Sequence, residues 1–103
     1  MHKTFRITGK KQADGAQTIS LAGYERVVRK QVQIDVSATP GAGTMAVAVR
    51  TPGSDEYVTA DTINMVSGTR VFLVDLYCDS IRFTPTSYDA AKTYDITVFC
   101  LQG

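Results

Sequence analysis

Apolar and polar residues alternate along most of the chain, in short runs separated by glycine, proline and small polar residues. The clearest run spans residues 30–37. Its apolar positions are Val32, Ile34 and Val36, and its polar positions are Gln31, Gln33 and Asp35. A period of two places successive side chains on opposite faces of a β-strand. The run therefore predicts a strand with one buried face, and a slip of one residue would invert that face.

Further runs of this kind predict other strands over most of the sequence. They cover residues 4–8, 17–21, 44–50, 56–59, 79–84 and 93–101. In the third of these runs the pattern turns Met45, Val47 and Val49 inward and Ala46 and Ala48 outward. Residues 9–15 are expected to form a turn or an exposed loop. Residues 63–66 are predicted to be either a further short strand or part of an extended connection.

Residues 70–76 break the alternation, because four apolar residues follow one another there. They are Val71, Phe72, Leu73 and Val74. A strand that is apolar on both faces is typical of the centre of a covered sheet or of a subunit interface. The sequence therefore predicts that this run contacts protein on both sides.

Eight or so strands at intervals of about 8 to 12 residues are typical of an all-β fold. The chain shows no convincing amphipathic helix, and only residues 89–93 are expected to form a brief helical turn. We therefore predict an antiparallel two-sheet sandwich or jelly roll. The length of 103 residues suits one modest core, so a single domain is expected over residues 1–103.

The charge of the chain is balanced, with 11 basic against 10 acidic residues and a formal net charge of +1. The nearest approach to a basic cluster is Lys10 and Lys11, or Arg26, Arg29 and Lys30, which we interpret as ordinary solvated faces. Nucleic acid is not an expected partner, because a phosphate-binding surface needs clustered positive charge. No membrane span or signal peptide is apparent, so synthesis in the cytoplasm is expected.

Candidate catalytic chemistry is sparse. His2 is the only histidine and lies beside the initiating methionine, where packing is a poor means of holding a general base. The two cysteines, Cys78 and Cys100, are interpreted as buried free thiols, although a disulfide stays possible if their strands are neighbours. No catalytic residue, cofactor site or metal site is predicted, and the chain is not expected to be an enzyme.

Two groups of side chains leave alternatives open. Asp55, Glu56 and Asp61 lie close together near a turn, where a solvated loop is favoured over a calcium site or an acid and base pair. Tyrosines in sheets mostly pack against neighbouring strands. Tyr24, Tyr57 and Tyr88 are nevertheless the candidates for a recognition surface.

Residues 15–21, 44–53, 80–85 and 93–98 together resemble the small β-sandwich virion proteins of tailed bacteriophages. The resemblance implies a non-enzymatic head decoration, cement or tail-associated subunit that contacts other virion proteins and forms a homo-oligomer. It implies a place in the virion after synthesis in the host cytoplasm. The expected interface residues are Lys10, Lys11, Val71, Phe72, Leu73, Val74 and Tyr88. The alternative is a carbohydrate-binding or adhesive module that uses exposed tyrosines.

Residues 89–94 also resemble the corner of immunoglobulin-like and fibronectin-like domains, where a tyrosine hydroxyl ties a turn to the following strand. In this chain that tyrosine would be Tyr94. The strand that follows it is the last, whereas those families continue with another. A jelly roll or a truncated sandwich therefore stays open.

Overall fold

The computed structural model describes residues 2–21, 29–36, 43–65, 69–75, 78–88 and 92–101. These ranges hold strands and one short 3-10 helix. They are β1 (His2–Lys10), η1 (Gln12–Asp14), β2 (Gln17–Ser20), β3 (Arg29–Val36), β4 (Thr44–Arg50), β5 (Tyr57–Asn64), β6 (Thr69–Asp75), β7 (Ser80–Thr86) and β8 (Tyr94–Leu101). The predicted all-β class is confirmed. A search of the same ranges for a helix with the length and apolar character of a membrane span finds none.

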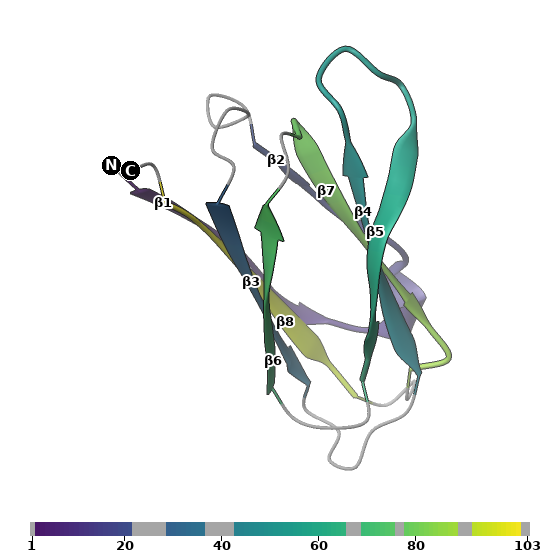
Figure 1. Ribbon diagram of the computed structural model, residues 1–103. Helices are drawn as coiled ribbons and strands as arrows, with labels where there is room; N and C mark the ends of the chain where they lie inside the picture. The colour runs from purple at the N-terminus through teal and green to yellow at the C-terminus, as the bar shows by residue number, and fades with distance from the viewer. Residues whose placement is uncertain are drawn as a thin grey trace.

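The strands form two four-stranded sheets that pack face to face (Figure 1). Sheet A has the order β1-β8-β3-β6 and sheet B the order β2-β7-β4-β5. All the pairings between these strands are antiparallel. In sheet A they join β1 to β8, β8 to β3 and β3 to β6, and in sheet B they join β2 to β7, β7 to β4 and β4 to β5. This order is that of a jelly roll, in which the two halves of the chain fold back along each other. It decides between the two architectures that the sequence allowed.

The core lies between the sheets and follows the predicted alternation. In sheet A, Val32 lies opposite Val98 and Ile34 lies opposite Ile96. In sheet B, Val47 lies opposite Phe83. All six side chains are fully buried. The apolar face that the sequence assigned to each central strand is therefore the face that packs against the other sheet.

Ala48 is buried as well, although the sequence predicted that it faces outward. It lies opposite Arg82 in the ladder between β4 and β7. The guanidinium of Arg82 lies 4.2 Å from the centre of the Tyr57 ring on β5, so the arginine side chain crosses β4. An alanine beneath such a side chain is covered from the outside.

Two predicted boundaries change in the structure. Strand β1 runs on to Lys10, so the turn expected over residues 9–15 is partly strand and partly the helix η1. Strand β5 is one strand over Tyr57–Asn64 and not two pieces, because a bulge at Ala60 lets it continue past the interruption. The helical turn expected at residues 89–93 falls largely outside the described residues.

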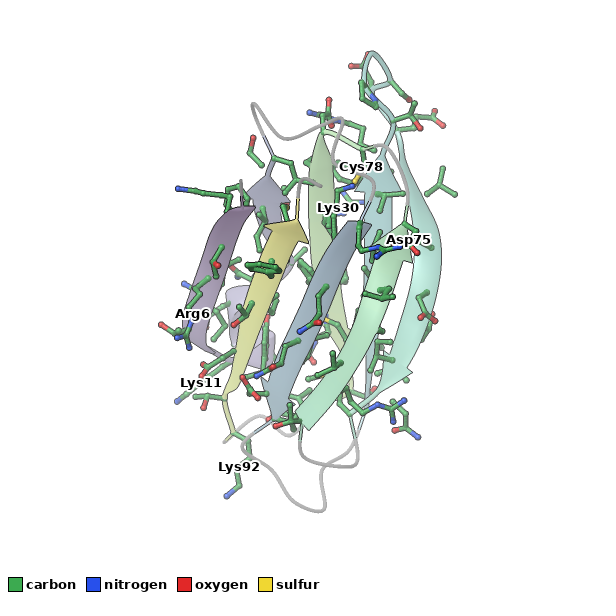
Figure 2. All side chains as sticks on the ribbon, turned by 60° about the vertical axis from the view of Figure 1, so that its left-hand side comes forward. Arg6, Lys11, Lys30, Asp75, Cys78 and Lys92 are labelled. Carbon is green, nitrogen blue, oxygen red and sulfur yellow. The ribbon has the colours of Figure 1, made fainter. Side chains whose placement is uncertain are left out.

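Lys30 is the clearest departure, because the sequence predicted a solvated lysine and the structure buries it completely. It shares the inner face of β3 with Val32, and it lies between Cys100 on β8 and Val74 on β6. Figure 2 shows Lys30 at the same end of the sandwich as Cys78. An ammonium group is costly to bury, so its place in the core reflects interactions made there.

The approach of Gly43 to residues 86 and 87 gives a test of this packing. Gly43 has a φ of 91°, and a Cβ on it would meet the carbonyl oxygen of Thr86 and lie 2.6 Å from the carbonyl carbon of Ser87. Gly53 has a φ of 90° and open space around it. We expect Gly53→Ala to lower the free energy of unfolding by about 1 kcal/mol, from backbone strain alone. Gly43→Ala should cost at least about 2 kcal/mol more, because a backbone collision adds to the strain.

Urea denaturation of the two variants measures this difference. Because both glycines have nearly the same φ, the Gly53 variant is the control for strain. Equal losses of stability would contradict the close contact between Gly43 and the end of β7.

Candidate functional site

Three large apolar side chains are exposed in the part of the chain that the structure describes: Val58 (66%), Val71 (54%) and Leu73 (58%). Val71 and Leu73 lie two residues apart on β6 and point outward from sheet A. Between and beside them, Phe72 is half-buried and Val74 is buried. Strand β6 therefore presents two neighbouring apolar side chains to solvent at one edge of the sheet.

This pair continues into two rows across the outer face of sheet A, which Figure 2 views directly. One row runs from Leu73 through Gln31 and Phe99 to Thr4. The other runs from Val71 through Gln33 and Thr97 to Arg6. Arg6, on the far edge strand β1, is the one charged residue in these rows. From Val71 and Leu73 as far as β1, these two rows are therefore uncharged and partly apolar.

The edge strands of the two sheets differ in how they are protected against pairing with another chain. Strand β1 carries Lys3 and Arg6 and has an irregular register at its end. Strand β2 has four residues, and β5 carries the bulge at Ala60 and the charged Asp61. Charges, bulges and short length are the devices that block edge pairing. Strand β6 pairs with β3 over seven residues without a shift in register, and its charged residues, Arg70 and Asp75, lie toward its two ends.

Of the two faces of residues 71–74 that were predicted to contact protein, the structure shows the inner one packed against the core. The sequence allowed a central strand, which is wrong, because β6 lies at the edge of sheet A. Its outward side chains are exposed, so within one chain the run packs on its inner side. The second alternative for this run, a subunit interface, stays a prediction.

Lys10 and Lys11 lie at the other edge of sheet A. Lys10 is half-buried at the end of β1 and lies opposite Tyr94, and Lys11 is exposed. The backbone N–H of Lys11 donates to a carboxylate oxygen of Asp14 over 2.8 Å. In Figure 2, Lys11 and β6 flank the sheet on opposite sides. The structure therefore does not bring the two sets of predicted interface residues together.

Tyr88 is not the surface residue that the sequence predicted. It is 4% exposed, and its hydroxyl donates to the carbonyl oxygen of Thr93 over 2.6 Å. Its ring packs edge to face against Tyr94, with 5.9 Å between the ring centres. This burial leaves the ring no face for a partner, so Tyr88 drops out of the candidate surface. Tyr24 lies outside the described residues.

The resemblance to an immunoglobulin-like corner also needs correction. The hydroxyl that ties the turn to β8 is that of Tyr88, whereas the hydroxyl of Tyr94 is buried without a hydrogen-bond partner in the described structure. Burial raises the pKa of Tyr94 to about 12. The hydrogen bond to Thr93, just before β8, therefore comes from Tyr88 and not from Tyr94.

A second cluster, which the sequence did not reveal, lies on the outer face of sheet B. The Arg50 guanidinium lies 2.9 Å from a carboxylate oxygen of Asp79. The hydroxyls of Tyr57 and Ser80 lie 2.7 Å apart, and Ser80 also donates to Asp79 over 3.2 Å. The guanidinium of Arg82 lies over the Tyr57 ring. Alternation alone placed Arg82 outward, but only the strand order brings these residues together.

The polar cluster around Asp79 holds neighbouring strands of sheet B together. The backbone N–H of Asp79 donates to the carbonyl oxygen of Arg50, and its carbonyl oxygen accepts from the N–H of Leu21. Asp79 therefore joins β4, the end of β2 and the start of β7. The hydrogen bond from Arg50 lowers the pKa of the Asp79 carboxyl. The guanidinium groups of Arg50 and Arg82 lie over the Tyr57 ring, so less of that ring is available to a ligand.

The remaining candidate residues are the exposed Asp61 and the two buried cysteines. Asp61 is exposed on β5, and its carboxylate accepts from the Thr62 N–H. The described residues hold no group of three or more His, Cys, Asp or Glu side chains arranged for a metal ion. Cys78 and Cys100 are buried free thiols, as predicted, and burial raises the pKa of each.

Comparison with known proteins shows the fold and no family. No protein-family model matches the chain, and no curated protein matches it in sequence. Among solved structures, SPBc2 prophage-derived protein YomS is similar at a TM-score of 0.62 and 10% identity, over 98% of this chain and 96% of YomS. A mutant of CBM29-2, a family 29 carbohydrate-binding module, is similar at a TM-score of 0.58 and 18% identity. The match covers 97% of this chain and 71% of the CBM29-2 chain.

A putative α-L-fucosidase from Bacteroides thetaiotaomicron is similar at a TM-score of 0.65 and 14% identity. The match covers 94% of this chain but only 22% of that one, so the chain spans about a fifth of that protein. At these identities the similarity establishes a shared β-sandwich fold.

The ion pair on sheet B predicts a specific pH dependence. Because Arg50 lowers the pKa of Asp79, the pair stabilises the fold above the ordinary aspartate pKa of about 4 and loses this effect as the pH falls through the lowered value. We expect Asp79→Asn to be less stable than the parent at pH 7 and equally stable in strong acid. Urea unfolding of both proteins between pH 7 and pH 2 measures this. Asp61→Asn is the control, and a difference that does not change with pH would contradict the role of the charge.

Proposed function

We propose that the protein is a non-enzymatic structural subunit of a tailed-phage particle, a capsid decoration or cement protein or a tail-associated subunit. The observation that carries this proposal is the regular, unprotected edge of β6 with Val71 and Leu73 exposed on it. Such an edge is a ready site for contact with another protein chain. The likeness in fold and length to a prophage-derived protein supports the phage setting.

In this role the protein acts through contacts between subunits. Burial of apolar surface stabilises a contact by roughly 25 cal/mol per Å². Two side chains supply only a few kcal/mol, but a particle repeats the same contact in many copies, and linked contacts strengthen one another. The role requires no catalytic group, cofactor, nucleic acid or membrane. The protein would reach the particle from the host cytoplasm.

The proposal predicts that purified phage particles contain this protein and that β6 helps to hold it there. We expect the double variant Val71→Lys and Leu73→Lys to be at least about tenfold depleted from particles, because two apolar contacts are lost. Quantitative mass spectrometry of particles from hosts that carry each form of the gene measures the depletion.

Val58→Lys is the matched control, since Val58 is equally apolar and exposed but lies on the bulged strand β5. Circular dichroism checks that each variant folds. Absence of the parent protein from purified particles would refute the proposed function.

Carbohydrate binding is a second candidate, and the outer face of sheet A is the feature that favours it. Phe99 lies there between Thr4 on β1 and Gln31 on β3. An aromatic ring flanked by a hydroxyl and an amide suits a ligand with apolar and polar faces, as a sugar has. The fold is shared with a carbohydrate-binding module. The tyrosines first considered for this function, Tyr57 and Tyr88, are packed against other residues of the chain.

This second candidate predicts that the protein binds immobilised glycans and that Phe99→Ala weakens binding at least about tenfold, because the stacking surface is removed. A glycan array with both proteins measures this. Tyr57→Phe serves as the control, since it keeps the ring that lies on sheet B. A parent protein that retains no glycan would exclude this candidate and leave the first in place.

A further inference from the structure

We infer that β6 pairs antiparallel with β6 of a second copy of this chain, about a two-fold axis at Phe72, to form one continuous sheet of four strands from each copy. The inference rests on the proposed function, because it names the partner of the same edge. It follows from three properties of the strand: its free edge, the arrangement of its side chains and the placement of its charges.

The free edge is regular enough to pair. Strand β6 keeps the register of β3 over residues 69–75, and no described strand lies on its other side. Its backbone groups on that side therefore repeat at the spacing that another β-strand needs. No bulge interrupts β6 as one interrupts β5, and its two charged residues, Arg70 and Asp75, lie toward its ends.

The alternation of side chains restricts the register. Directly opposed residues in an antiparallel pair lie on the same face, so a continuous sheet must place the outward Val71 and Leu73 opposite outward residues. With Phe72 opposite its own copy, Val71 lies opposite Leu73 of the second copy, and this contact occurs twice. If the register shifts by two residues in either direction, one of Val71 and Leu73 lies opposite its own copy. The other then lies opposite the polar Thr69 or Asp75.

The charges of the strand favour an antiparallel arrangement of two copies. Arg70 lies near the start of β6 and Asp75 at its end. In antiparallel pairing about Phe72, Arg70 of one copy lies opposite Val74 of the other and so next to its Asp75 along the strand, on the other face of the sheet. Parallel pairing would instead bring the two arginine ends together and the two aspartate ends together. The strand is thus complementary to itself, as a two-fold interface requires, and this is why we assign a second copy as the occupant.

Disulfide formation between two cysteine variants tests the register directly. In the proposed pair, residues 71 and 73 of different copies have Cα atoms about 4.5 to 5.5 Å apart, within the range that a disulfide joins. Residue 71 and its own copy are diagonal neighbours about 7 to 8 Å apart, beyond that range. A mixture of Val71→Cys and Leu73→Cys proteins should therefore form covalent dimers with diamide at least about tenfold faster than either variant alone.

The parent protein, which keeps the buried Cys78 and Cys100, is the control for unspecific oxidation. Faster dimer formation by one variant alone would overturn the register, and equal rates in all samples would overturn the β6 pairing.

Sedimentation velocity on the unmodified chain is the second measurement. We expect a dimer that Leu73→Lys dissociates and that Val58→Lys does not. A monomer at all concentrations would overturn this inference. If the protein were nevertheless found in phage particles, the proposed function would still stand. A dimer that depends on β6, from a protein that is absent from phage particles, would support this inference and refute the proposed function.

Discussion

Burial of alternate side chains between two antiparallel sheets is the constraint on which this structure depends. The central strands β3 and β8, and β7 and β4 across from them, turn their apolar residues inward in matching register. Hydrogen bonds of the ladders satisfy the backbone of these strands, which lets their inner faces lose contact with water. Each open sheet still ends in two strands whose outer backbone groups have no partner within that sheet. The fold therefore creates edges that the sequence has to manage.

The sequence predicted the strands and their faces well, because a period of two depends on neighbouring residues alone. The strand order was beyond its reach, since antiparallel pairing joins β1 to β8 and β3 to β6 over long stretches of chain. That is why residues 71–74 could not be assigned to an edge. The alternation also put Lys30 on the same face as Val32, yet its charge argued for solvent. The structure buries Lys30, so its position in the strand outweighed its charge.

The candidate site was predictable in part, for the same reason. The apolar run on β6 was visible in the sequence, and its exposed members are Val71 and Leu73. Tyr88 was misplaced because residues of a polar connection usually lie in solvent, whereas the Tyr88 side chain is buried and its hydroxyl donates to the Thr93 carbonyl. The cluster of Arg50, Asp79 and Tyr57 was missed because its members come from three separate segments. Their proximity depends on the ladder of sheet B.

The contrast among the edges is the strongest link between this fold and a function. Exposed apolar residues on a regular edge give a monomer no stability and expose it to aggregation, so an unguarded edge is a liability unless another chain covers it. Three edges carry a charge, a bulge or a short strand, so this sequence does contain such protection. The fourth edge instead carries Val71 and Leu73 and ends in opposite charges. Protection of three edges and a self-complementary fourth are together the pattern expected of a subunit that assembles through β6.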